Sequence, residues 1–180
     1  MACCTTQRRL ALTAAAPAFD VAVIGLGAMG AATLYQLARR GVRAIGVDRF
    51  TPPHSFGSSH GETRITRQAI GEGAAYVPLV LRSHAIWDEL EAATGTRLIE
   101  RCGFLAIAAP EARAEVHGTP GFVAATIATA QQFGIVHEVP GATETARRFP
   151  QFALRGDETC YYEPGGGYVI PESCIAAQLH

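Results

Sequence analysis

The stretch that decides the fold is residues 20–30, Asp20-Val-Ala-Val-Ile-Gly25-Leu-Gly27-Ala-Met-Gly30. Its first five residues form a short apolar run, which is typical of a strand buried on both faces. Three glycines follow at the spacing G-x-G-x-x-G, and each meets a steric need. Gly25 allows the tight turn out of the strand, Gly27 lets a pyrophosphate approach the backbone, and Gly30 lets the next helix pack closely on the strand.

A helix and a second strand complete this unit. Alanines and leucines at spacings of three and four predict a helix over residues 31–40, which Gly41 ends. Its N-terminal N–H groups and positive dipole end would face phosphates. Residues 42–47 form a second apolar run that ends at Asp48. An acid at about 20 positions beyond the last glycine is expected to bind the adenosine ribose, and it disfavours a 2′-phosphate.

The glycine spacing alone also fits a glycine-rich turn in an ordinary α/β domain. Strand, glycines, helix, second strand and terminal acid occur here in the order that a dinucleotide site requires. Together they favour a dinucleotide site.

Composition limits the remaining classes of protein. The chain has 180 residues, of which 48% are hydrophobic and 17% charged, as in a globular domain. A net charge of −1 gives no reason to expect nucleic acid or an anionic membrane as a partner. No apolar run approaches the roughly 20 residues of a membrane-spanning helix. The cysteines number five, with no C-x-x-C spacing, so we expect no disulfide framework, no metal site and a cytoplasmic location.

The N-terminal segment, residues 1–18, is interpreted apart from the fold. Arg8 and Arg9 precede an apolar run over residues 10–18, which loosely resembles an export signal, and the paired arginines loosely resemble one of the twin-arginine type. The alternative that we favour is a disordered tail or a start codon placed upstream of the true one.

Further elements follow from local patterns along the chain. Residues 50–63 are rich in proline, glycine, serine and histidine, and they predict an irregular loop at the ligand-binding edge of the sheet. We expect helices over residues 76–93, 120–133 and 143–149 and from residue 171 onward. We expect strands over residues 97–100, 104–108, 135–139, 159–163 and 167–170.

The chain resembles the family of monomeric sarcosine oxidase and N-methyltryptophan oxidase, which are flavoproteins with a fold of the D-amino-acid-oxidase type. The resemblance runs from about Phe19 to the last residue. Its most specific part is Gly57-Ser-Ser-His-Gly-Glu-Thr-Arg-Ile-Thr-Arg67. Further motifs that carry it are Pro52-Pro-His54, Gly71-Glu-Gly73, Glu163-Pro164 and Glu172-Ser-Cys-Ile175.

The resemblance implies FAD rather than NAD as the cofactor. It implies that the glycine turn holds the pyrophosphate, that Asp48 holds the adenosine ribose, and that the loop around His60 lies beside the flavin with Arg64. The FAD-binding residues it implies are Gly25, Gly27, Ala28, Met29, Gly30, Asp48, Arg49, Ser58, Ser59, His60 and Arg64.

The resemblance also implies the residues of the reaction. Arg67 would pair with the substrate carboxylate, since a guanidinium offers a planar fork to a carboxylate. Arg64 would neighbour the flavin, and His60 would tune it or donate a hydrogen bond to it. The plain alternatives are two solvated arginines and an ordinary loop histidine.

Some family features have no match in the sequence. Ile70 stands where family members carry an aromatic residue. The resemblance therefore does not define the pocket for the substrate's N-substituent, nor the particular substrate. The family attaches its flavin through a cysteine of the C-terminal half, which none of the five cysteines here matches. The family's oxygen-activating lysine also has no counterpart, because the sequence contains no lysine. We therefore expect the front portion of a longer enzyme, or an incomplete gene product.

The predicted fold is α/β, an incomplete Rossmann-like FAD-binding domain with the start of an α+β substrate domain. Residues 19–80 would begin the FAD-binding domain, residues 81–165 would begin the substrate domain with interleaved elements, and residues 166–180 would return to the first domain.

The predicted protein is a monomeric FAD-dependent oxidase. It would use O₂ to oxidise sarcosine or another secondary amino acid, giving H₂O₂, an aldehyde and an amine. The alternatives are a truncated, non-catalytic remnant of such an enzyme and an NAD-dependent dehydrogenase with the same glycine fingerprint.

Overall fold

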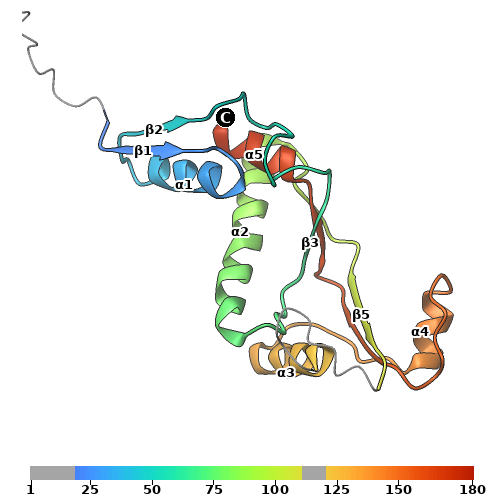
Figure 1. Cartoon of the computed structure of the whole chain (residues 1–180). Coiled ribbons are helices and arrows are strands. Elements are labelled where there is room, and N and C mark those ends of the chain that lie inside the picture. The colour runs from blue at the N-terminus through green and yellow to red at the C-terminus, as the bar shows by residue number, and fades with distance from the viewer. Residues whose placement is uncertain (1–18, 111–120) are drawn as a thin grey trace, which may run out of the picture.

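The computed structural model describes residues 19–110 and 121–180 (Figure 1). Both interpretations of residues 1–18 lie outside this part of the chain, as do Cys3 and Cys4. No helix of the described residues is long and apolar enough to cross a membrane. The same residues contain no group of three or more His, Cys, Asp or Glu side chains that could hold a metal ion.

The predicted strand–helix–strand unit is present. Its elements are β1 (Val21–Ile24), α1 (Ala28–Arg39) and β2 (Ala44–Val47). The two strands are parallel, as expected when a helix forms the crossover between them. The helix begins directly after Gly27, three residues earlier than the apolar spacing predicts, because Ala28 and Met29 already belong to its first turn.

The β1–β2 pair is covered on one face only. Alternate residues of each strand pack toward α1, and a Cβ at Gly46 would lie 2.6 Å from Leu34 Cδ2. The residues between them face outward, with Ile24 86% exposed and Val47 50% exposed. The prediction of a strand buried on both faces is therefore wrong for the described residues, because none of them forms a second layer over this face.

The remaining strands form a long antiparallel limb, which Figure 1 shows descending from the β1–β2 unit. Its strands are β3 (Arg64–Thr66), β4 (Ile99–Glu100), β5 (Phe104–Ala108), β6 (Thr159–Glu163) and β7 (Gly167–Val169). Within the described residues, β7 pairs with both β3 and β4, and β5 pairs with β6. The predicted strand over residues 135–139 is wrong, since only Glu138 makes a bridge there, to Tyr162.

Four further helices complete the described structure: α2 (Val77–Thr94), which follows the short 3-10 turn η1 (Ala74–Tyr76), α3 (Phe122–Phe133), α4 (Ala142–Arg148) and α5 (Pro171–Leu179). Gly95 and Gly134 end α2 and α3 in the left-handed conformation, with φ of 66° and 64°. Glycine adopts that conformation without a Cβ penalty, so both predicted helix ends are confirmed.

Two buried clusters lie at opposite ends of α2. One core packs α3 against the β5–β6 sheet, and the other joins α1, α2 and α5. Val77, at the start of α2, belongs to the first core, and Leu90, near its end, belongs to the second. The helix runs without a break across residue 80, where the sequence predicts a domain boundary, and the domain boundaries stay predictions.

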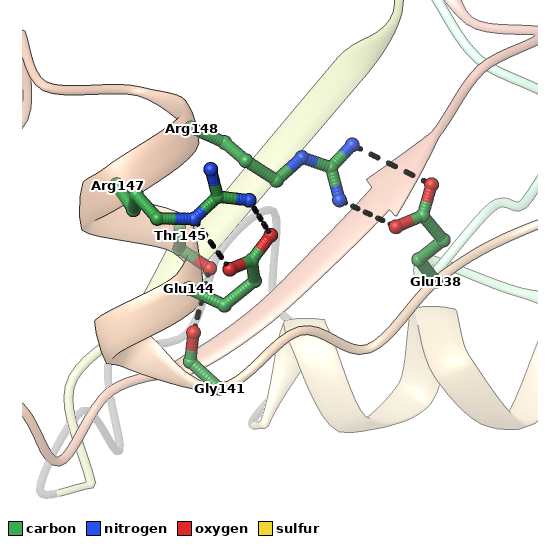
Figure 2. Close-up of polar contacts among 6 residues, drawn as sticks. All are labelled: Glu138, Gly141, Glu144, Thr145, Arg147 and Arg148. Carbon is green, nitrogen blue, oxygen red and sulfur yellow. Dashed lines mark hydrogen bonds and ion pairs between the residues drawn. The ribbon is translucent and has the colours of Figure 1, made fainter.

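The α4 helix is held at the tip of the limb by its basic residues (Figure 2). Arg148 donates from both terminal nitrogens to the Glu138 carboxylate, and its guanidinium lies 4.8 Å from the centre of the Tyr162 ring. Arg147 pairs with Glu144 one turn earlier on the same helix. Such exposed pairs contribute little to stability, so they fix the direction of α4 more than they stabilise the fold.

The first prediction concerns the close approach of α1 to β1. A Cβ at Gly30 would lie 1.7 Å from the carbonyl oxygen of Gly25, a backbone atom that cannot rotate away. Gly30→Ala should lower the free energy of unfolding by about 2–3 kcal/mol, as forced overpacking does. Chemical denaturation followed by far-ultraviolet circular dichroism measures this difference.

Gly141→Ala is the matched control. Gly141 has φ −65° and open space around its missing Cβ, so this change should alter stability by less than about 1 kcal/mol. Equal losses in the two variants would contradict the close contact at Gly30.

Candidate functional site

The glycine turn leaves the N-terminus of α1 open to an anion. Gly25 has φ 86° and donates its N–H to the carbonyl oxygen of Val47, which turns the chain out of β1. Gly27 is the N-cap residue of α1, no side chain of its own caps the helix, and the first turn contains no acidic residue. N–H groups and the positive dipole end at such a terminus favour a phosphate.

Asp48, at the end of β2, ties this strand to the glycine turn. Its Oδ2 accepts the Leu26 N–H at 2.6 Å, and its Oδ1 accepts the Phe50 N–H at 2.9 Å. His54 Nε2 lies 3.2 Å from the same Oδ1. The N–H groups of Phe50 and Leu26 lower the pKa of Asp48 to about 2, so the carboxylate is ionised at neutral pH.

The loop after Pro53 folds back over the glycine turn. Ser59 Oγ accepts the N–H of Ala28, the first residue of α1, at 3.1 Å. A Cβ at Gly27 would lie 3.2 Å from the same oxygen, so a larger residue at Gly27 would push the loop away. The predicted serine loop and the predicted glycine turn are therefore neighbours, although 31 positions separate Ala28 from Ser59.

Arg64 holds that loop through three carbonyl groups. Its guanidinium donates to the carbonyl oxygens of Ser58, His60 and Thr63 at 3.0, 2.5 and 2.7 Å. From the other side, Glu172 Oε1 accepts the Gly61 N–H at 2.7 Å, and this bond lowers the pKa of Glu172. His60 is half-buried close to Glu172 and helps to keep that carboxyl ionised.

Two cavities share the loop. A cavity of about 290 Å³ is lined by Gly25, Gly27, Asp48, Arg49, Phe50, His54, Ser58 and Ser59 among others. A second cavity of about 420 Å³ is lined by Ala28, Met29, Ser58, Ser59, Arg64, Trp87 and Cys174 among others. The two cavities meet at Ser58 and Ser59, beside the N-terminus of α1. Of the residues predicted to bind FAD, Gly30 and His60 line neither cavity.

Arg67 lies in different surroundings from Arg64. Because residues 64–66 are extended, side chains three positions apart point in opposite directions. Arg67 lines neither cavity. Its side chain is 19% exposed, and its Nη2 donates to both oxygens of Glu72 at 2.5 and 2.7 Å.

Two aromatic rings lie near the Arg67 guanidinium, and one of its own donor nitrogens makes no hydrogen bond. Its guanidinium carbon lies 5.5 Å from the centre of the Phe104 ring and 5.3 Å from that of Phe122. Its Nε is buried and has no hydrogen-bond partner. The site is thus a half-buried guanidinium that already binds a carboxylate.

Three acidic residues of this region are absent from the predicted site: Glu72, Glu163 and Glu172. Each belongs to a segment that carries the family resemblance, and that is the only signal for them in the sequence. The partners of Glu163 and Glu172 could not be predicted, because Glu172 lies 111 positions from Gly61 and Glu163 lies 95 positions from Gln68.

Comparison with known proteins defines the class. Residues 20–180 match the family described as FAD dependent oxidoreductase. The chain therefore belongs to this family, and membership implies FAD as the cofactor. The predicted resemblance and the predicted α/β fold are confirmed.

Particular relatives are similar over nearly all of the chain. It is 41% identical to the monomeric sarcosine oxidase of Streptomyces avermitilis over 91% of its residues, and 36% identical to the N-methyl-L-tryptophan oxidase of Yersinia pestis over 87%. The chain spans 40% of the length of each of these curated relatives.

Solved structures agree with this placement. An open form of NikD, an unusual amino acid oxidase essential for nikkomycin biosynthesis, matches with a TM-score of 0.73 and 28% identity, over 89% of this chain and 39% of that one. Glycine oxidase from Geobacillus kaustophilus matches with a TM-score of 0.62 over 89% of this chain and 43% of that one. At 23% identity, the second match shows the fold alone.

The second prediction follows from the pKa of Asp48. Because folding lowers this pKa from the ordinary value to about 2, the ionised carboxylate stabilises the folded chain above about pH 4. That stabilisation is lost as the pH falls toward 2. Wild type should therefore be more stable than Asp48→Asn at pH 7, with a difference that narrows from pH 4 downward.

Denaturation curves at a series of pH values measure this narrowing. Asp157→Asn, at an exposed aspartate, is the control and should remain close to wild type throughout. A constant difference between wild type and Asp48→Asn at every pH would show that folding does not lower the pKa of Asp48.

Proposed function

We propose that the protein is an FAD-dependent oxidase of secondary amino acids, such as sarcosine or another N-methyl amino acid. It would use O₂ and give H₂O₂, an aldehyde and an amine. The observation that carries this proposal is the open N-terminus of α1, flanked by two cavities that meet at Ser58 and Ser59. The names of the two relatives support the class of substrate.

The residues present fit a dinucleotide. Gly27 has no side chain and lines the cavity of about 290 Å³, so a pyrophosphate in that cavity would meet the backbone of the glycine turn. Asp48 would bind the adenosine ribose in the cavity of about 290 Å³, with Arg49 at its side. The flavin end would lie toward Arg64 and Met29 in the other cavity.

The roles of the chain's own groups are orientation and charge. FAD, when bound, supplies the two-electron acceptor and its reoxidation by O₂. Arg64 would keep the loop from Ser58 to His60 in place beside the ring, since its donors are taken by backbone carbonyls. His60 would add charge or a hydrogen bond there.

Arg67 would seat the substrate carboxylate. Its fork already binds one carboxylate, that of Glu72, in a half-buried setting where charge-assisted hydrogen bonds are strong. A substrate carboxylate of the same shape could replace Glu72 at this fork.

The proposal also covers how the flavin is attached, the oligomeric state of the protein and its location in the cell. Cys174 lines the cavity of about 420 Å³, but burial raises the pKa of its thiol to about 12, which makes it a poor nucleophile. We therefore expect no covalent bond from Cys174 to the flavin. A monomer agrees with the name of one relative, and the free, buried Cys160 and Cys174 agree with the cytoplasm.

The third prediction tests the cofactor. The purified chain, incubated with FAD and desalted, should keep visible flavin bands and should release H₂O₂ when sarcosine is added. Gly27→Val should lose the bands, because its side chain would push away the Ser59 loop that lines both cavities, whereas Gly141→Ala should keep them.

Two other results would overturn this function. A colourless chain that NADH stabilises against heat would be a nicotinamide-dependent dehydrogenase. A chain indifferent to both cofactors would be a non-catalytic remnant.

The fourth prediction tests Arg67. Arg67→Ala should raise KM for sarcosine about ten- to a hundredfold, which corresponds to the loss of a hydrogen-bonded charge. FAD content should stay at the wild-type level, since Arg67 lines neither cavity. Steady-state kinetics and the visible spectrum measure the two quantities.

Arg147→Ala is the control, because that side chain is 73% exposed on α4. Its kinetics should equal those of wild type. Unchanged kinetics in Arg67→Ala as well would remove Arg67 from the substrate site.

A further inference from the structure

Glu163, at the end of β6, is a fully buried carboxylate whose two oxygens are both occupied. Its Oε1 accepts the N–H of Gln68 at 2.6 Å. Its Oε2 accepts the N–H of Ala69 at 3.1 Å and the hydroxyl of Tyr161 at 2.7 Å. The residue is 0% exposed. A buried carboxyl group is tolerated only with such partners, and these bonds hold the backbone of two successive residues.

Those two residues come directly after Arg67. Glu72, which binds the Arg67 guanidinium, lies three positions beyond Ala69. The segment that Glu163 holds therefore carries Arg67 at one end and its carboxylate partner at the other. Ala69 is itself 0% exposed and belongs to the hydrophobic core, so the middle of this segment is packed inside the structure.

Glu172 makes the same kind of contact on the N-terminal side of β3. Its Oε1 accepts the N–H groups of Gly61 and Glu62 at 2.7 and 3.4 Å. Between the two carboxylates, β3 pairs with β7 in antiparallel register, with Arg64 opposite Val169. The two glutamates thus bind backbone N–H groups on the two sides of β3. Glu172 binds on the side nearer to Arg64, and Glu163 binds on the side nearer to Arg67.

We propose that Glu163 is a positioning residue for Arg67, and that it sets the place of the guanidinium that receives the substrate carboxylate. This inference rests on the proposed function of Arg67. Glu172, by contrast, positions the loop from Ser58 to Glu62 beside the nucleotide. Because the two glutamates hold different segments, we expect loss of the Glu163 carboxylate to change substrate affinity and loss of the Glu172 carboxylate to change cofactor affinity.

The test uses the whole chain loaded with FAD and sarcosine as the probe. Glu163→Gln puts an NH₂ group where an oxygen now accepts from Gln68 or from Ala69 and Tyr161, so one contact is lost. It should raise KM for sarcosine about tenfold or more, with a smaller change in kcat, since small misplacements of binding groups are costly. The affinity for FAD should stay within about twofold, which is less than 0.5 kcal/mol.

Three further variants separate positioning from stability. Tyr161→Phe removes one bond to the same carboxylate but leaves both backbone contacts, so its KM should equal that of wild type whatever its stability. Glu172→Gln should weaken FAD binding instead. Glu163→Asp keeps the charge on a shorter side chain, and it should raise KM even if Glu163→Gln does not fold.

Amide hydrogen exchange gives a readout that needs no activity. The amides of Gln68 and Ala69 should exchange faster in Glu163→Gln and at the wild-type rate in Glu172→Gln. Wild type that oxidises sarcosine, with KM unchanged in Glu163→Gln and Glu163→Asp, would overturn the positioning role alone. Wild type that binds FAD but neither binds nor oxidises sarcosine would overturn the proposed function and this inference with it.

Discussion

The pairing of β3 with β7 is the contact on which the candidate site depends. It brings residues 64–66 against residues 167–169, and those two segments connect the β1–β2 unit to the antiparallel limb. Both predicted site arginines lie in or directly after β3. Without this pairing, Arg64 would have no fixed distance from the glycine turn, and Arg67 would not reach the rings of Phe104 and Phe122.

Carboxylates support the irregular backbone around that pairing. Loops leave N–H groups without the partners that a helix or a sheet provides, and buried N–H groups need acceptors. Asp48, Glu163 and Glu172 each accept the N–H groups of two residues, and Glu91 does the same for Leu98 and Ile99. Acidic side chains in this protein thus hold loop backbone in place, in addition to forming ion pairs on the surface.

The sequence predicts the parts of this structure that arise from local steric rules. The glycine turn, the helix ends at Gly95 and Gly134 and the acid at the end of β2 each follow from neighbouring residues. The contacts of Glu163 and Glu172 do not, because they depend on a pairing between segments about a hundred positions apart. Burial on both faces of β1 fails for another reason: it assumes a second layer that no described residue supplies, and Ile24 stays exposed.

Arg64 and Arg67 show why residue type and spacing alone cannot separate two roles. Arg64 donates to backbone carbonyls, which are fixed parts of the loop that it stabilises. Arg67 donates to a side-chain carboxylate, and a side chain can rotate away without unfolding the backbone. Replacing the partner of Arg67 would therefore displace one side chain, while replacing the partners of Arg64 would disrupt the backbone of the loop from Ser58 to Thr63. This difference in what each guanidinium binds supports the proposal that Arg67 binds the substrate and that Arg64 holds the loop beside the cofactor.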